Sequence, residues 1–549
     1  MKYNGKTYHY DQHRIDSEND AACWLQRMPD FLPVRLQNVL HRRQSGLHEI
    51  INMDGDALYR KVKGILFYGG IMAETIKPMI HKYCQNGTYM LLDVNSGIIN
   101  VIDKMTYDIL DVYDGSNAAA VYDAFEGTYD RKDIEETLGE LDELIKKEML
   151  FAPMAENFKV VAEEEPIVKS LCLNIAHDCN LRCKYCFASQ GDYDTHKREL
   201  MSFDVAKKAV DLLIRSTEGK RQHCEIDFFG GEPLMNFGVV KQTIEYIREQ
   251  EKIHDKVFKL SLTTNGMLLD PAKVKYLTDN HISLILSLDG RPEVHNRMRP
   301  DAGGHGSYDA CAKNLVYAAE HRNGEEYYVR GTYTTYNLDF AKDVEHMADL
   351  GFEGLSMEPV VGDDLSYAIT DRDLPRIYEE YDRLTDLYLQ RMDEGRPFIY
   401  YHFIMDLYRG PCIAKRLRGC GAGHEYMCVV PNGDIYPCHQ FVGQEGYVIG
   451  NVDDGITDTK LPPLFRDMHV LNKPTCCDCW AKFFCSGGCH ANNIKYGGDI
   501  KTPYALSCKI QKKRIECAMY IQAVLAMRGQ KARLFGDEQP DCEGCGTCG

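Results

Sequence analysis

Short apolar runs alternate with longer amphipathic stretches between residues 168 and 365. Six runs have the length of a buried strand: 171–175, 224–229, 260–264, 283–287, 328–333 and 354–358. Segments between them, such as 203–216 and 240–250, repeat apolar residues at helical spacing. Repeated strand–helix units predict a parallel sheet, closed or partly closed. We therefore expect an α/β domain over 168–365, a partial (β/α)6 barrel with functional side chains at the carboxyl ends of its strands.

A second pattern covers residues 79–160. Two strand-like runs, 89–94 and 98–102, flank Asn95-Ser-Gly97, where the glycine suits the positive φ of a hairpin turn. Helical patterns follow at 106–112, 118–125 and 134–145. We expect a small α+β domain of two or three strands and three helices, with a linker at 155–166.

The other segments carry weaker patterns. Residues 1–78 are polar and show no motif, although Gly69-Gly70-Ile71-Met72 is what a ribosome-binding site and start codon would encode. We hypothesise that translation begins at Met72 or Met79; the alternative is an additional small domain. Residues 366–409 predict a helical connector. Residues 526–549 predict a flexible tail whose three cysteines could bind metal, cap a cluster, be redox-active or imitate a Cys-rich substrate.

Composition narrows the class of protein. The chain has 549 residues, 44% of them apolar and 27% charged, which is typical of a soluble protein of two to four domains. It has no run of 18 uninterrupted apolar residues and no signal-peptide pattern, so we expect a cytoplasmic protein without a membrane span. The net charge of −18 argues against a nucleic-acid surface and allows a cationic peptide partner.

The 22 cysteines are concentrated in four segments: 179–186, 412–438, 476–508 and 542–548. A secreted disulfide scaffold would be small and carry a signal peptide, so the chain does not fit that class. In a reducing compartment, clustered cysteines indicate ligands of metals or iron–sulfur clusters.

Directly after the first barrel run, Cys179, Cys183 and Cys186 are spaced C-x3-C-x2-C. A 4Fe–4S cluster has four iron corners, each usually held by one thiolate. Three thiolates would leave the fourth iron open to a distant residue or a small molecule. The alternative is a zinc site that lacks one ligand.

This spacing, with Tyr185 before the last cysteine, resembles the radical S-adenosylmethionine (SAM) family. In that family the open iron is chelated by the amino and carboxylate groups of SAM. The resemblance includes Gly230-Gly231-Glu232-Pro233 after the second run, which is similar to the family's GGEP element. It implies that these four residues and Tyr185 belong to the cofactor site, with Glu232 accepting from the SAM ammonium.

The same resemblance implies roles at later strand ends. Ser287 and Arg299 would hold the ribose and carboxylate of SAM, with Arg297 as the competitor for the second role. Asp289 takes the position of a catalytic carboxylate in sulfatase-maturing relatives, or is structural. Glu358 is a weaker candidate for the adenosine side.

The C-terminal cysteines over 410–525 resemble the SPASM extension, in which two further 4Fe–4S clusters bind. The pattern is Cys420-x12-Gly433-x4-Cys438, then Cys476-x2-Cys479-x5-Cys485-x3-Cys489, then Cys508. By resemblance, the ligands of an outer cluster would be Cys476, Cys479, Cys485 and Cys508, and those of an inner cluster Cys420, Cys438 and Cys489. For the fourth inner corner, Cys412 is the first choice and Cys428 the second, and an open iron for a substrate thiolate is the third.

Several segments narrow the resemblance to the maturases of six-cysteines-in-forty-five-residues (SCIFF) peptides. They are Met79-Ile-His, Leu92-Asp-Val-Asn-Ser-Gly97, Gly410-Pro-Cys412-Ile-Ala-Lys-Arg-Leu, Cys420-Gly-Ala-Gly-His, Asp434-Ile-Tyr-Pro-Cys438-His-Gln-Phe and Cys479-Trp-Ala-Lys-Phe-Phe-Cys485-Ser-Gly-Gly-Cys489. Those enzymes join Cys sulfurs of a ribosomal peptide to other residues as thioethers. Cys428 and the terminal cysteines depart from the family's pattern.

The resemblance implies three 4Fe–4S clusters, SAM, a Cys-rich precursor peptide with a leader, and an electron donor such as ferredoxin or flavodoxin. Residues 79–160 resemble winged-helix leader-recognition domains, which bind a peptide as an added strand. Three alternatives remain. They are a sulfatase-maturing enzyme that forms formylglycine, a maturation enzyme for quinone cofactor precursors, and a non-enzymatic electron carrier or zinc scaffold.

Overall fold

The computed structural model describes residues 2–3, 6–7, 79–154, 167–404 and 413–530. The chain divides into two compact units, 1–77 with 546–549, and 78–545. In the first unit the structure describes a short antiparallel ladder of β1 (Lys2–Tyr3) and β2 (Lys6–Thr7). The predictions for the rest of 1–78, the linker, Cys412 and the terminal cysteines lie outside the described residues.

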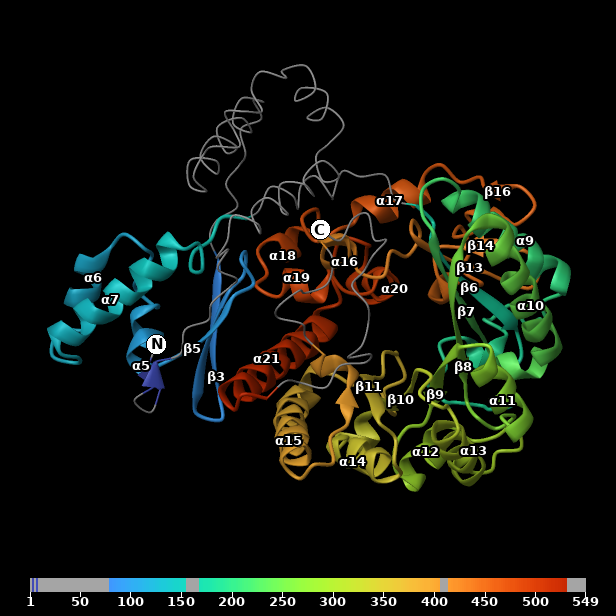
Figure 1. Cartoon of the computed structure of the whole chain (residues 1–549), viewed down its shortest axis with the longest axis horizontal. Helices are drawn as coiled ribbons and strands as arrows, with labels where there is room; N and C mark the ends of the chain where they lie inside the picture. Colours follow the sequence, from blue (N-terminus) through green and yellow to red (C-terminus); the bar gives the residue numbers. More distant parts are fainter. Residues whose placement is uncertain (1, 4–5, 8–78, 155–166, 405–412, 531–549) are drawn as a thin grey trace, which may run out of the picture. The chain divides into compact units, whose positions relative to one another are not determined.

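A parallel sheet forms the barrel part of the second unit (Figure 1), and its strands β6 to β12 are neighbours in chain order. The strands are β6 (Ser170–Ala176), β7 (His223–Gly230), β8 (Val257–Thr264), β9 (Ile282–Ser287), β10 (Tyr327–Tyr333), β11 (Gly354–Pro359) and β12 (Ile399–Tyr400). Each adjacent pair is parallel. Every predicted run lies inside one of the first six strands, which confirms the predicted parallel α/β sheet, and this sheet is open.

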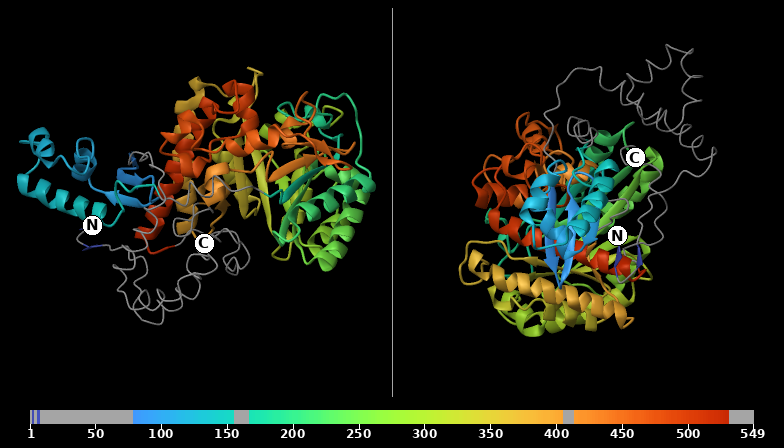
Figure 2. Two further views of the ribbon diagram at one scale, coloured as in Figure 1. Left: turned by 90° about the horizontal axis from the view of Figure 1, so that it is seen from above. Right: turned by 90° about the vertical axis from the view of Figure 1, so that its left-hand side faces the viewer.

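Helices follow these strands and cover the outer side of the sheet (Figures 1 and 2). They are α9 (Phe203–Thr217), α10 (Phe237–His254), α11 (Pro271–Asp279), α12 (Pro292–Met298), α13 (Tyr308–Glu320), α14 (Ala341–Asp349) and α15 (Leu374–Asp393). In β7, Cys224, Ile226 and Phe228 are buried in the core, whereas Glu225 and Asp227 alternate with them and face the barrel interior. The interior is therefore polar.

The cysteine-rich extension lengthens the same sheet beyond β6. Strand β13 (Tyr426–Val429) pairs parallel with β6, and β14 (Asp434–Tyr436), β15 (Gly450–Asn451) and β16 (Gly455–Ile456) continue antiparallel. A hairpin turn between β13 and β14 contains Gly433 at φ +90°, as the Asn-Gly-Asp signal predicts. The pairing of β13 with β6 was not predicted, because a strand of four residues gives too little alternation to place it.

The N-terminal part of the second unit has the expected three strands and three helices. Its antiparallel sheet runs β3 (Ile80–Gln85), β4 (Thr88–Asp93), β5 (Ile99–Ile102), followed by α5 (Lys104–Ile109), α6 (Ala118–Ala124) and α7 (Arg131–Lys146). From β3, His81 Nε2 lies 2.9 Å from Glu516 Oε1, and Tyr83 donates to the Glu516 carbonyl at 2.8 Å. Glu516 belongs to α21 (Ala505–Met527), which therefore joins this sheet to the cysteine-rich extension.

Short helices build most of the extension. They are α16 (Ile413–Arg418), α17 (Leu461–Asp467), α18 (Pro474–Cys477), α19 (Lys482–Cys485) and α20 (His490–Asn492). Across the described part of the chain, no helix has both the length and the apolar character that a bilayer span needs.

Candidate functional site

The three-cysteine loop leaves the carboxyl end of β6 and packs against the end of β7. Gly231 N donates to Ala176 O at 2.7 Å, and Glu232 N donates to Asp178 O at 2.9 Å. A Cβ added at Gly231 would lie 2.1 Å from Asp178 O, and one at Gly230 would lie 2.4 Å from Ala176 O. The sequence suggested that these glycines admit a ligand; in the structure they admit the backbone of the cysteine loop.

The thiols of Cys179, Cys183 and Cys186 lie close enough to influence one another electrostatically. Burial raises the pKa of Cys179 and of Cys183 to about 12. Backbone N–H groups already donate to two of the sulfurs, Leu181 N to Cys179 at 3.4 Å and Gln190 N to Cys186 at 3.3 Å. These donors suit thiolate ligands, whose protons leave when a metal group binds.

In the described segments, no three His, Cys, Asp or Glu side chains converge as ligands of a single metal ion. A four-iron cubane gives each thiolate its own iron. The three-cysteine spacing and the two N–H donors to sulfur are compatible with thiolate ligands of such a cluster.

Glu232 lies at the start of the short 3-10 helix η3 (Pro233–Asn236) and is 1% exposed. Its Oε1 accepts from Leu234 N at 3.1 Å and from Thr264 Oγ1 at 2.8 Å, and its Oε2 accepts from Asn265 N at 2.8 Å. A carboxylate can accept about four hydrogen bonds, so one position remains for an ammonium donor. The Glu232 charge also acts on Cys179, which places this acceptor beside the three-cysteine loop.

Asp289, Tyr185 and Arg299 form a buried triad beside the same loop. Tyr185 donates to Asp289 Oδ2 at 2.5 Å, and Arg299 Nη1 lies 3.2 Å from the Tyr185 hydroxyl and 3.6 Å from Asp289 Oδ1. Asp289 Oδ1 also accepts from Thr332 N at 3.1 Å, and the side chain has no exposed surface. Burial raises the pKa of Asp289, and Arg299 opposes this. Asp289 is thus held in a fixed, partnered position.

Arg299 and Arg297, the two candidates for the SAM carboxylate, lie in different surroundings. Arg299 is 8% exposed, acts on Cys183, and has a buried Nε without a partner among the described residues. Arg297 instead stacks over the ring of Tyr336, at 3.5 Å from the ring centroid. An unpartnered buried donor beside the cysteine loop favours Arg299. Ser287 is the last residue of β9, at the same edge of the sheet.

Glu358 is engaged elsewhere. Its Oε2 accepts from Arg514 Nη2 of α21 at 2.7 Å, and its Oε1 lies 3.0 Å from His402 Nε2. Arg514 holds the pKa of Glu358 well below its usual range. The carboxylate fastens the C-terminal helix to the barrel, which is a different use from the adenosine contact that the sequence suggested.

In the extension, the structure brings together the predicted outer set. The Cys508 thiol of α21 lies within electrostatic range of three other cysteines, Cys476, Cys479 and Cys485, and burial and their negative charges together raise its pKa. Burial raises the pKa of Cys476 and of Cys508 to about 11. Helix α19 ends at Cys485 because Ser486 adopts the left-handed conformation, and the amides that follow donate to the Cys485 sulfur.

The predicted inner set also lies together. Cys438 follows the hairpin strand β14 and lies within electrostatic range of Cys420 and Cys489, and burial and their negative charges together raise its pKa. Cys428 faces Cys172, its register partner on β6, and is fully buried. Cys412 lies outside the described residues, so the fourth inner corner stays a prediction.

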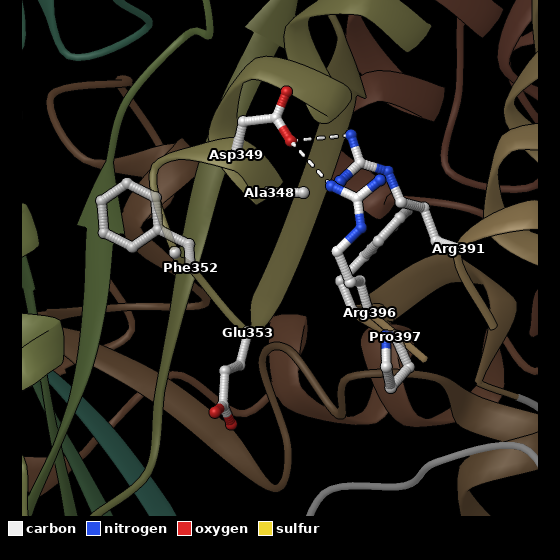
Figure 3. Close-up of a pocket in the computed structure, with 9 residues that line it drawn as sticks. Ala348, Asp349, Phe352, Glu353, Arg391, Arg396 and Pro397 are labelled. Carbon is white, nitrogen blue, oxygen red and sulfur yellow. Dashed lines mark ion pairs between the residues drawn. The ribbon is translucent and has the colours of Figure 1, made fainter. Parts of the chain in front are cut away.

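Two cavities lie away from the cysteine loop. One of about 370 Å³ opens in the barrel interior and is lined by polar residues of β7 to β9 and by Tyr328 and Tyr401. The other, of about 280 Å³, lies at the amino end of β11 (Figure 3). Its Arg391 and Arg396 both pair with Asp349, at 2.8 and 4.0 Å, so its charges are already satisfied. We assign it no function.

Sequence reasoning missed three residues that organise these sites. His295 is fully buried, accepts from Asp289 N at 3.3 Å and contacts Ser307 Oγ at 3.0 Å. Arg514 neutralises Glu358, and Lys473 is buried among the extension's cysteines. None of these three residues belongs to a sequence motif with a recognisable spacing. The signal for Lys473 was a cation three residues before Cys476, where a C-x2-C motif begins.

Comparison with known proteins agrees with this geometry. Residues 173–350 match the Radical SAM superfamily, so the chain contains a radical SAM domain. That superfamily uses a 4Fe–4S cluster and SAM.

Two relatives extend the match. The chain is 24% identical over 364 residues, 63% of its length and 72% of the relative, to the radical SAM cyclopropyl synthase TigE of Paramaledivibacter caminithermalis. It is 25% identical over 349 residues, 59% of its length and 89% of the relative, to a cysteine-type anaerobic sulfatase-maturating enzyme of Clostridium novyi. The chain is therefore similar to radical SAM enzymes of the sulfatase-maturase and peptide-maturase type.

Among solved structures, native anSMEcpe with bound AdoMet and Cp18Cys peptide superimposes with a TM-score of 0.55 at 21% identity. The match covers 66% of this chain and 99% of that one. At this identity the likeness shows the shared fold.

Proposed function

We propose that this protein is a radical SAM maturase that forms Cys thioether crosslinks in a ribosomally synthesised, Cys-rich peptide. The observation that carries the proposal is the separation of the ten described cysteines, out of eleven predicted ligands, into distinct sets. The described members form a partly buried trio at the β6 end, the outer set around Cys508 and the inner set around Cys438. One open cluster with SAM and two auxiliary clusters would use them all.

Residues at the ends of β7 and β9 support binding of SAM. Glu232 keeps one acceptor position for the amino group, Arg299 offers an unpartnered buried donor for the carboxylate, and Ser287 offers a hydroxyl at the adjoining strand end. When bound, the reduced cluster and SAM supply a 5′-deoxyadenosyl radical, which can remove a carbon-bound hydrogen from the substrate. The protein binds, orients and excludes water.

Thioether formation joins a Cys sulfur to a carbon that has lost its hydrogen atom, and it leaves one surplus electron. The two auxiliary cysteine sets provide sites for its acceptors. An open inner corner could also hold the substrate thiolate. Sites for these electron acceptors beside a SAM site are one reason to propose an enzyme that forms thioethers rather than a simple electron carrier.

The N-terminal sheet suits recognition of the peptide leader. Its edge strands are β3 and β5, and neither pairs with another described strand at its outer side. A peptide can add to such an edge through main-chain hydrogen bonds. Contacts from β3 to Glu516 link this sheet to the helix that carries Cys508, so leader and auxiliary sites share one framework.

The test uses the full chain, reconstituted anaerobically, with SAM, a reductant and a Cys-rich precursor peptide that carries a leader. The wild type should release 5′-deoxyadenosine and lower the peptide mass through crosslinking. Cys179→Ala should still bind the peptide and form no 5′-deoxyadenosine, whereas Gly238→Ala, in α10 where a Cβ meets nothing within 4 Å, should behave as wild type. Normal turnover by Cys179→Ala would defeat the assignment.

A sulfatase-maturing function is the second candidate, because the relative in Clostridium novyi is named for it. It predicts formylglycine in a sulfatase-derived peptide. The N-terminal sheet favours the first candidate, since a leader needs such a docking edge. Formylglycine without any thioether product would reverse this order.

A further inference from the structure

Two lysines are buried in the cysteine-rich extension. Lys473 has no exposed surface and Lys482 is 1% exposed. Burying an ammonium is costly unless opposite charge or several acceptors surround it. Lys473 Nζ donates to Gly487 O at 2.7 Å, and Lys473 forms no ion pair with an Asp or Glu in the described part of the chain. Its compensating charge must come from other groups.

The groups around Lys473 are cysteines of both auxiliary sets. Burial lowers the pKa of Lys473, and the neighbouring thiols oppose this shift: Cys476 and Cys485 of the outer set, and Cys489 and Cys420 of the inner set. The loop between Cys485 and Cys489 closes over it, and a Cβ at Gly487 would lie 3.0 Å from Nζ.

Local hydrogen bonds fix this position. The Lys473 carbonyl accepts from Cys476 N at 2.9 Å and from Cys477 N at 3.1 Å, so the residue caps α18. Asn493 Nδ2 donates to Gly487 O at 3.2 Å, beside the ammonium. Hydrogen bonds therefore fix both the backbone and the terminal nitrogen of Lys473 between the outer and the inner cysteine sets.

We infer that Lys473 is a shared counter-charge that stabilises the reduced form of both auxiliary clusters. This inference rests on the proposed function, in which both cysteine sets hold clusters. Reduction adds one negative charge to a cluster, and a fixed positive charge in a low-dielectric interior favours that state. Lys473 thereby raises both reduction potentials together and makes the pair a better acceptor for the surplus electron.

Lys482 provides a matched control. It is equally buried, and its Nζ donates to Cys477 O at 3.0 Å. The groups that act on its ammonium are Cys477, Asp478 and Cys479, of which only Cys479 is an assigned ligand, in the outer set. A change at Lys482 should therefore affect one auxiliary cluster, and a change at Lys473 both.

The experiment is a redox titration followed by electron paramagnetic resonance. It uses the full chain with Cys179, Cys183 and Cys186 changed to Ala, so that only auxiliary signals remain. Lys473→Met should lower the midpoint potential of each auxiliary cluster by about 59 mV or more. For a one-electron couple this is a tenfold change in the equilibrium constant for reduction. Lys482→Met should lower one of them. Unchanged potentials in Lys473→Met, or a shift of only one, would overturn the inference.

Iron analysis separates the possible failures. The proposed function fails if the chain that lacks Cys179, Cys183 and Cys186 but keeps Lys473 holds neither auxiliary cluster. Only the inference about Lys473 fails if that chain holds both clusters and Lys473→Met leaves their midpoint potentials unchanged. Should Lys473→Met bind less auxiliary iron, Lys473→Gln decides, because Gln can still donate toward Gly487 O without a charge. The same deficit in Lys473→Gln supports the counter-charge, and full recovery contradicts it.

Discussion

At the scale of single residues, Asp289 is a fully partnered carboxylate beside the three-cysteine loop. Both of its oxygens are engaged, by Tyr185, Thr332 N and Arg299, and none of its surface is exposed. Tyr185 is the residue before Cys186, so the carboxylate fixes the three-cysteine loop through the tyrosine. We therefore regard Asp289 as a positioning residue rather than as a base that contacts the substrate.

Asp289→Asn tests this view, because the amide keeps the shape and removes the charge. Arg299 would then be buried beside a neutral group, and such a loss costs about 3–5 kcal/mol of the unfolding free energy. Asp349→Asn, which removes a half-exposed partner of Arg391, should cost about 1 kcal/mol or less. Denaturant unfolding measures both. Equal stability of the two variants, with activity lost only in Asp289→Asn, would instead indicate a catalytic carboxylate.

His177, two residues before Cys179, gives a pH dependence. Burial lowers its pKa from 6.5 to about 4, so between these values the unfolded chain binds more protons than the folded chain. Stability contributed by neutral His177 is present above pH 6.5 and is lost as pH falls through this window. Between pH 7 and pH 5 the loss is about 2 kcal/mol.

The measurement is the unfolding free energy of wild type and His177→Gln at both pH values. The variant should lose about 2 kcal/mol less on acidification, since it has no imidazole to protonate. An equal loss in both proteins would show that His177 stays protonated or solvated in the folded chain.

The sequence allows the cysteine sets to be predicted but leaves their polar surroundings open. Ligand spacing is local, so Cys476, Cys479 and Cys485 could be grouped from a short segment. Arg514 and Glu358 are separated by 156 positions and meet only after the barrel and extension have folded. Local sequence carries no information about such a pair, so the ion pair of Glu358 with Arg514 could not be predicted, and its adenosine contact stays a prediction.

At the scale of elements, the ends of β6 and β7 must meet closely to place the cysteine loop. Gly231→Ala tests this packing, because its Cβ would lie 2.1 Å from the backbone oxygen of Asp178. The loop must move, so the variant should lose the cluster of Cys179, Cys183 and Cys186 and keep auxiliary iron. Iron analysis with SAM binding measures the effect.

Gly238→Ala is the control for that variant. Gly238 lies in α10, and a Cβ there meets nothing within 4 Å. Replacing a helical Gly by Ala should stabilise the protein by about 1 kcal/mol and leave iron content unchanged. Similar iron loss in both variants would show that the contact at Gly231 is not the cause.

Long elements were predictable and short ones were not. The six barrel strands stand out as apolar runs of five or six residues between helical segments, and each was located from sequence. Strands β13 to β16 have two to four residues, and their place beside β6 depends on tertiary pairing. Strand β3 could be expected only as an optional third strand.

At the scale of the whole molecule, one hydrophobic core joins the N-terminal sheet to the cysteine-rich extension. It contains Met90 and Leu92 of β4 together with Cys476, Phe483 and Met519 of the extension. His81 of β3 also stacks on Trp480, next to Cys479, with ring centroids 3.7 Å apart. The sheet that we propose as the leader-docking site therefore packs against the segment that carries the outer cysteine set.

The central claim is that one chain carries three separate cluster sites. Its most direct test is the iron and sulfide content of the anaerobically reconstituted chain. The account predicts about twelve of each per wild-type chain and about eight when Cys179, Cys183 and Cys186 are changed to Ala. A wild type with about four irons, or with zinc in the extension, would contradict it.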